Sequence, residues 1–119
     1  SLTNALAIAY GGTGAKTASA ARTNLGIAAT SLYNGTLTSG SITFNYGNYN
    51  FYIIIGRPSS TSSRAALVVP KIMLTTSAVS FQIADESNYK SFNLYYSGST
   101  TTLAIQGGAG QINRVFGVN

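Results

Sequence analysis

Apolar and polar residues alternate with a period of two through much of residues 31–119. Successive side chains of a strand point to opposite faces, so this alternation predicts strands with one buried and one solvated face. Two continuous apolar runs, Phe51–Ile55 and Ala65–Val69, instead predict strands that are covered on both faces. The alternating sets are Ile42, Phe44 and Tyr46; Val79, Phe81 and Ile83; Phe92, Leu94 and Tyr96; and Leu103 with Ile105.

Clusters of turn-forming residues separate these segments at spacings of about 8–12 residues, as in all-β domains. The turn signals are Asn34-Gly35, Ser39-Gly40, Gly47-Asn48, Pro58–Ser63, Asp85–Asn88, Ser97-Gly98 and Gly107–Gly110. Roughly seven or eight strands of this kind are typical of an antiparallel sandwich or barrel. We therefore predict an all-β fold, with an antiparallel β-sandwich as its architecture.

Residues 1–30 differ from the rest because they are rich in Ala and Gly and contain one aromatic residue, Tyr10. Alanine side chains bury little apolar area, so this part cannot form a core of its own. We expect residues 1–30 to be a neck and residues 31–119 to be a separate head.

A short helix is predicted within the neck, over Thr17–Leu25. Thr17 or Lys16 can cap its first turn, and Gly26 stands where a left-handed residue commonly ends a helix. Because nine residues are fewer than the ~12–15 that an isolated helix needs, the helix must pack on something. Its narrow apolar stripe comprises Ala18, Ala21 and Leu25.

Charged residues make up 8% of the chain, seven basic and two acidic, for a net charge of +5. The basic residues are scattered and form no run, so nucleic acid is not an expected partner. A chain with so few charges has few residues to block pairing at its sheet edges. Covering those edges with identical neighbours solves this problem, and we therefore expect self-association.

The sequence lacks the residues and spacings that common catalytic sites use. It contains no His or Cys, which removes the usual zinc, haem and thiolate sites, and we expect no metal and no cofactor. The glycine-rich loop Gly11–Lys16 lacks the spacing of a phosphate-binding loop. The two carboxylates, Asp85 and Glu86, are adjacent, and adjacent strand residues point to opposite faces. A hydrolase that uses two carboxylates needs both to face one substrate, which here would require carboxylates from different chains to come together. We therefore expect a non-enzymatic protein.

Ser, Thr, Asn, Tyr and Gly together form about half of the chain, a palette close to that of antibody loops. It concentrates in Tyr46–Tyr52, Arg57–Arg64 and Asp85–Tyr89. Tyrosine and asparagine suit sugars or protein loops, whereas arginine suits phosphates or acidic groups. The candidate receptor-binding residues are Tyr46, Asn48, Tyr49, Asn50, Arg57, Ser60, Arg64 and Tyr89.

The string Y-G-G-T-G-A-K-T-A-S-A-A-R-T-N-L-G-I, residues 10–27, resembles a segment of tailed-bacteriophage tail fibres of the lambda-like and Mu-like side-fibre type. The resemblance implies an intertwined homotrimer at the distal end of a fibre on the virion. Its head would bind lipopolysaccharide or an outer-membrane protein during adsorption to the host cell, and a separate chaperone would assist assembly. The residues implied in neck and trimer packing are Ala18, Ala21, Arg22 and Leu25.

Three alternatives remain open at this point. The chain can be a structural module that trimerises and registers the fibre without touching the receptor. It can be a surface-polysaccharide depolymerase, which would require Asp85 and Glu86 for activity. It can also be the end of a bacterial trimeric adhesin.

Overall fold

The structure, a computed structural model, describes residues 5–26 and 29–119. Residues 1–4 and 27–28, which belong to the predicted neck, lie outside the described residues. The described part of the neck contains a 3₁₀ turn, η1 (Ile8–Tyr10), and one short helix, α1 (Ala18–Asn24).

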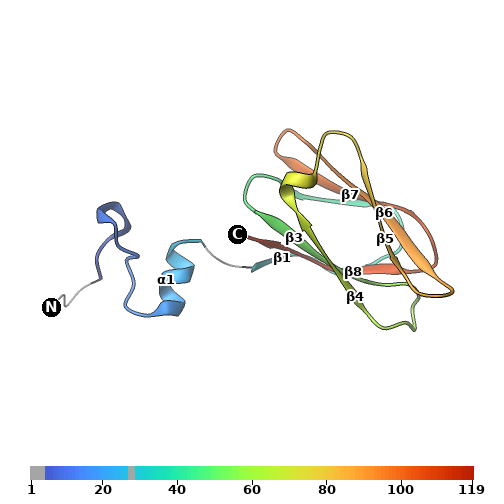
Figure 1. The fold of residues 1–119 in the computed structure, drawn as a ribbon, viewed down its shortest axis with the longest axis horizontal. Helices are drawn as coiled ribbons and strands as arrows, with labels where there is room; N and C mark the ends of the chain where they lie inside the picture. The colour runs from blue at the N-terminus through green and yellow to red at the C-terminus, as the bar shows by residue number, and fades with distance from the viewer. Residues whose placement is uncertain (1–4, 27–28) are drawn as a thin grey trace.

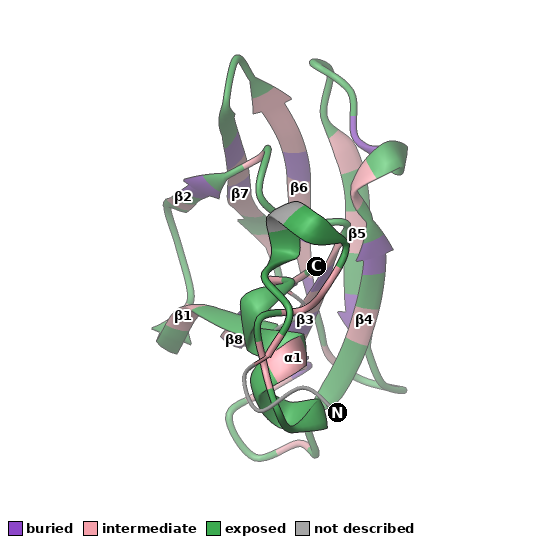
Figure 2. Cartoon of the chain, turned by 90° about the vertical axis from the view of Figure 1, so that its left-hand side faces the viewer, coloured by how far each residue is buried: buried purple, intermediate pink, exposed green. Residues whose placement is uncertain are grey.

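The helix α1 begins and ends as its sequence predicts. The hydroxyl of Thr17 accepts a hydrogen bond from the Ala20 N–H at 3.1 Å and so caps the first turn. Gly26 follows the last turn with a φ of +74°, a left-handed conformation that glycine adopts without steric cost. Figure 2 shows α1 largely in the colour of exposed residues, and all seven of its residues stay at least partly exposed. The neck packing predicted for Ala18, Ala21, Arg22 and Leu25 therefore stays a prediction.

The described residues of the head form eight strands, as expected for an all-β fold. They are β1 (Ala29–Leu37), β2 (Ser41–Asn45), β3 (Phe51–Arg57), β4 (Ala65–Pro70), β5 (Val79–Ala84), β6 (Tyr89–Ser97), β7 (Thr100–Gly107) and β8 (Gln111–Val118). A 3₁₀ turn, η2 (Lys71–Met73), follows β4. The first strand begins at Ala29, two residues before the predicted start of the head.

The strands form two four-stranded antiparallel sheets, ordered β1-β8-β3-β4 and β2-β7-β6-β5. Figure 1 shows the two sheets as facing layers, and the buried side chains between them belong to both. Those side chains are Tyr52, Ile54, Val69, Ile112 and Val115 from the first sheet, Phe44, Ile83, Phe92, Leu94 and Leu103 from the second, and Leu74 after η2. The expectation of two antiparallel sheets is thus confirmed.

The alternating segments point their apolar residues into this core, but the two continuous runs do not behave as predicted. Tyr52 and Ile54 are fully buried, whereas Ile53 between them faces outward and is partly exposed. In β4, Val69 is buried and Val68 is 62% exposed. Only one face of β3 and β4 is covered within the chain, so the prediction of strands covered on both faces is wrong for the single chain.

Asn34-Gly35 is not the turn that its sequence suggests. Both residues lie inside β1, where Asn34 pairs with Arg114 of β8. The tertiary pairing with β8 extends the strand through a dipeptide that is typical of hairpin turns. The chain turns instead after Leu37, where Gly40 adopts a φ of +78°.

The antiparallel order gives the head two distinct ends. One end, here the neck end, carries the start of β1, the end of β8 and the β2–β3, β4–β5 and β6–β7 connections. The opposite end, here the far end, carries the β1–β2, β3–β4, β5–β6 and β7–β8 connections. At the neck end the Asn119 amide donates a hydrogen bond to the carbonyl of Gly26, which links the end of the head to the neck. Figure 1 shows the C-terminus on the side of the neck.

Candidate functional site

The candidate receptor-binding residues do not form one surface. Half of them lie in or beside the β2–β3 connection at the neck end, and half lie at the far end. The neck-end group is Tyr46, Asn48, Tyr49 and Asn50, and the far-end group is Arg57, Ser60, Arg64 and Tyr89.

The tyrosines of the neck-end group pack within the chain. Tyr46 stacks on Tyr96 with ring centroids 4.1 Å apart, and the Lys71 ammonium lies 4.9 Å from the Tyr46 ring centre. Partial burial, together with the neighbouring Tyr96, raises the pKa of Tyr46. Tyr49 meets the buried Tyr52 edge to face at 6.0 Å and covers Gly117 of β8. Both rings therefore close the neck end of the core.

Far-end loops are joined by a chain of hydrogen bonds. Arg57 donates from Nε to the carbonyl of Ser62 at 2.7 Å, and the Ser62 hydroxyl donates to Asp85 at 2.9 Å. The other Asp85 oxygen accepts from the backbone N–H groups of Ser87 and Asn88, at 2.9 Å and 2.8 Å. These backbone bonds, followed by the bond from Ser62, lower the pKa of Asp85. Arg57 and Asp85 thus stabilise the β3–β4 and β5–β6 connections.

Lys90 joins the two remaining far-end connections from inside. Its side chain is 3% exposed, and its ammonium donates to the carbonyls of Thr38 at 3.0 Å and Gly108 at 2.6 Å. Burial lowers the pKa of Lys90, because the charged form loses its hydration. This ammonium stabilises the loops and points away from solvent.

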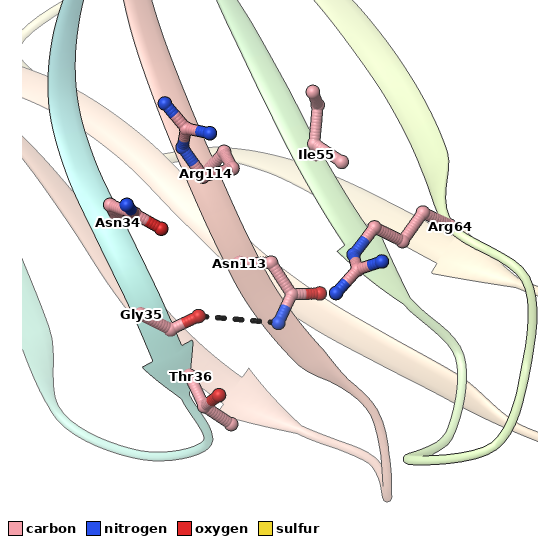
Figure 3. Close-up of a pocket in the computed structure, with 7 residues that line it drawn as sticks. All are labelled: Asn34, Gly35, Thr36, Ile55, Arg64, Asn113 and Arg114. Atoms are coloured by element: carbon pink, nitrogen blue, oxygen red, sulfur yellow. Dashed lines mark hydrogen bonds between the residues drawn. The ribbon is translucent and has the colours of Figure 1, made fainter.

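A pocket of about 390 Å³ opens on the first sheet near the far end. Figure 3 shows residues from β1, β3 and β8, together with Arg64 just before β4, around one hollow. Its seven lining residues are neutral or basic: Asn34, Gly35, Thr36, Ile55, Arg64, Asn113 and Arg114.

The pocket coincides with irregular pairing on both sides of β8. Against β3, the register moves from Arg114 to Ile112 over one step, so that Asn113 is an extra residue. Against β1, the partners of the same two residues are Asn34 and Leu37, so β1 also carries an extra residue there. Such bulges locally bend a strand and re-aim its side chains. The two coincident shifts account for a hollow in an otherwise regular sheet.

Two buried polar atoms of residues that line the pocket lack partners. Among residues 5–26 and 29–119, the buried side-chain polar atoms without a hydrogen-bond partner are Asn113 Oδ1 and Arg114 Nε. Asn113 is 6% exposed and uses its Nδ2 to donate to the carbonyl of Gly35 at 3.2 Å. Leaving a buried polar atom unpaired costs about 1–3 kcal/mol, and because solvent reaches neither atom, this cost belongs to the interior of the bulge and not to the surface of the pocket.

The pocket can attract a negatively charged group. Arg64 is exposed, and Arg114 is held by a 3.4 Å hydrogen bond to Ser31 and by its stacking 4.5 Å over Phe116. The acidic side chains of the chain, Asp85 and Glu86, lie in the β5–β6 connection of the other sheet, so the guanidinium group that is exposed beside the pocket is that of Arg64.

Of the pocket residues, the sequence analysis singled out only Arg64. Arg114, Asn113, Asn34 and Thr36 were missed, since they come from strands that are distant in the chain. The alternation of β8 places Arg114 on the outer face, but no spacing in the sequence indicates that Asn34 lies beside it.

The described residues contain no group of three or more His, Cys, Asp or Glu side chains placed to hold a metal ion. None of their helices has the length and apolar character needed to cross a membrane. Comparison of the chain with protein-family models, with curated proteins and with solved structures found no match.

Proposed function

We propose that this chain is the receptor-binding tip of a bacteriophage tail fibre, a non-enzymatic homotrimer that attaches the virion to lipopolysaccharide or an outer-membrane protein of its host. The observation that carries the proposal is the neck. Residues 10–26 of its tail-fibre-like string fold as a glycine-rich turn and a Thr17-capped helix, and they precede an all-β head in the sequence.

The arrangement of the head supports this proposal. The chain enters and leaves the head at the neck end, so the far end is free to meet another surface. Its connections are rich in Ser, Thr, Asn and Gly, as in Pro58–Ser63 and Gly107–Gly110. Small polar side chains supply adaptable hydrogen bonds to a sugar or a protein loop.

The outer faces of the two sheets differ, and this difference supports self-association. On the second sheet the outward residues are mostly polar, as with Thr43, Thr102 and Asn93. The first sheet has an apolar outer surface, here the apolar face, near the neck end. It comprises Phe51, Ile53, Val68, Phe116 and Val118, which are partly or largely exposed. Neighbouring copies that cover this face would remove apolar area from water.

Three copies per fibre, and several fibres per virion, would act together. Linked weak contacts gain from effective concentration, so a single tip need not bind tightly. Weak single contacts also let the virion release and search a cell surface.

A cell-binding experiment tests the proposal. The purified 119-residue chain is labelled and incubated with a panel of Gram-negative strains, including mutants that lack lipopolysaccharide sugars or single porins. We expect saturable binding that disappears with one mutant class and a particle of three times the 12.3 kDa chain mass by light scattering. A stable single-chain particle without cell binding would overturn the proposal.

A structural trimerisation module is the second candidate, and the packing of Tyr46 and Tyr49 favours it. Residues that looked exposed in the sequence instead close the neck end of the core. This candidate predicts the trimeric particle without any binding to cells, so the same experiment separates the two.

A further inference from the structure

We propose that Tyr89, at the start of β6, is a stacking platform for an uncharged sugar ring. The inference rests on the proposed function, because it names the receptor group that the far end would recognise. Tyr89 is 44% exposed, and among residues 29–119 it is the one aromatic residue that is largely exposed. It adjoins the β5–β6 and β7–β8 connections, which Figure 1 shows on the side of the head away from the neck.

The Tyr89 ring lies beside residues that have little or no side chain. A Cβ built on Gly108 would lie 2.7 Å from Tyr89 Cδ2, and one built on Gly107 would lie 3.9 Å from the Tyr89 hydroxyl oxygen. The partner of Tyr89 across β5 is Ala84, which carries only a methyl group. The Tyr89 carbonyl accepts a hydrogen bond from the Gly110 N–H at 3.0 Å, which ties the residue to the β7–β8 connection. The residue is thus held in place while its small neighbours leave the ring accessible.

A ring held in this way suits the apolar side of a sugar. Tyrosine offers a large, rigid contact area with only two side-chain torsions, so ordering it on binding costs little entropy. Its ring is apolar and its hydroxyl is polar, which matches a sugar ring with C–H groups on its faces and hydroxyls on its rim. Because the chain already positions Tyr89, the entropic cost of association falls further.

Hydrogen-bonding groups lie next to the ring on the outer face of the second sheet. Ser91 follows Tyr89 on that face, about 7 Å along the strand, and Gln82 is the partner of Ser91 across β5. Gln82 is exposed, and the Ser91 hydroxyl donates to the Gly107 carbonyl over a long 3.5 Å. Amides and hydroxyls both donate and accept, as sugar hydroxyls require. The platform therefore combines a ring with polar groups within reach of one sugar.

The charge near Tyr89 favours an uncharged sugar over an acidic one. Both acidic residues of the chain, Asp85 and Glu86, lie in the β5–β6 connection just before Tyr89. Asp85 is engaged by hydrogen bonds from the loops, whereas the Glu86 residue is exposed. The next residue, Lys90, is buried, and its ammonium is bound to backbone carbonyls. A carboxylate or phosphate on the sugar would therefore be repelled by the negative charge beside the platform.

The test is a nuclear magnetic resonance titration of the isotope-labelled full chain. The probes are D-glucose, D-galactose and their acids, D-glucuronate and D-galacturonate. We expect at least one of the neutral sugars to shift the amide signals of Tyr89 and Gly108 in a saturable manner. Its acid should bind about two- to fivefold more weakly, and Glu86→Gln should narrow that difference.

Matched variants show whether the ring is responsible. Tyr89→Ala should weaken the neutral sugar roughly tenfold or more, whereas Tyr89→Phe retains the ring and should keep most of the binding. Gln82→Ala, at an exposed position beside the platform, should weaken it a few-fold by removing a hydrogen-bonding partner. Tyr10→Ala removes a ring in the neck that is 80% exposed and should bind as the native chain does.

Four results would each overturn the proposal. They are no shift with either neutral sugar, an acid that binds as tightly as its neutral sugar, equal effects of Tyr89→Ala and Tyr10→Ala, and Tyr89-dependent binding to a purified porin in place of both sugars. The last result would assign Tyr89 to a protein contact.

This failure is distinguishable from failure of the proposed function. If the chain binds cells, but Tyr89→Ala binds them equally well and neither neutral sugar binds, the platform proposal fails and the tail-fibre tip stands. If a neutral sugar binds through Tyr89 but no strain in the panel is bound, the platform proposal stands and the tip fails.

Discussion

Asp85 is one of two acidic side chains in the chain, and its carboxylate holds the β5–β6 connection together. The bonds that it accepts favour the ionised form, so its pKa is lower in the folded chain than its ordinary value of 3.8. A group of this kind stabilises the fold above the unfolded pKa and loses that contribution as pH falls through the folded pKa.

Acid stability should therefore depend on Asp85. When the pH is lowered below about 3.8, the unfolded pKa of Asp85, we expect the urea concentration at the unfolding midpoint of the native chain to decrease. Asp85→Asn should be less stable at neutral pH and much less sensitive to acid. Glu86→Gln, the neighbouring control, should keep the acid sensitivity of the native chain; the same loss in both variants would contradict this role of Asp85.

The stability of the fold also depends on Gly117, because this position has no room for a side chain. An added Cβ would lie 2.6 Å from atoms at the base of the Tyr49 ring, too close for either group. We expect Gly117→Ala to lower the free energy of unfolding by about 1–3 kcal/mol through overpacking. In the Tyr49→Ala background the same change should cost little, since the clash is gone. Equal costs in both backgrounds, measured by urea unfolding, would show that Tyr49 does not cover Gly117.

At the scale of the strands, the apolar face stands out because no described part of the same chain covers its side chains. Val68 of β4 is 62% exposed in an apolar surrounding, whereas Gln82 of β5 is exposed on the polar outer surface of the other sheet. The two positions are suited to a comparison of the two surfaces.

We expect Val68→Lys to dissociate the assembled particle or weaken it by at least an order of magnitude in concentration, because it places an uncompensated charge in an apolar contact. Gln82→Lys adds the same charge to the polar surface and should leave the particle intact. Light scattering across a dilution series measures both. Dissociation by Gln82→Lys alone would place the contact on the second sheet.

Strands also mark the limit of what the sequence predicts. Alternation identified inward residues such as Phe44, Phe92 and Leu103 because one buried face imposes a period of two on any strand. It could not identify the pocket, since Asn113 becomes an extra residue only through the pairing of β8 with β3. The Asn34-Gly35 dipeptide failed as a turn signal for the same reason: long-range pairing overrides a local preference. The helix α1 was predictable because its cap and its terminal glycine lie within a few residues of it in the sequence.

On the scale of the whole molecule, the candidate receptor residues lie at two opposite ends of the head. Substitutions at each end can therefore test which end contacts the cell. Ser60 and Asn48 are both exposed loop residues, the first at the far end and the second at the neck end. If the far end meets the cell, Ser60→Trp should reduce binding of the chain to susceptible cells several-fold, because a large side chain holds the two surfaces apart. Asn48→Trp should bind as the native chain does. Flow cytometry compares them, and loss of binding in Asn48→Trp alone would place the contact at the neck end.

The four far-end connections have a further consequence, because none of them carries the chain into or out of the head. Their lengths and residues can change while the sheets and both chain ends keep their places, since surface loops tolerate insertions at small entropic cost. A scaffold built in this way can acquire new targets by exchanging loops, as long as the ties made by Asp85 and Lys90 are kept or replaced.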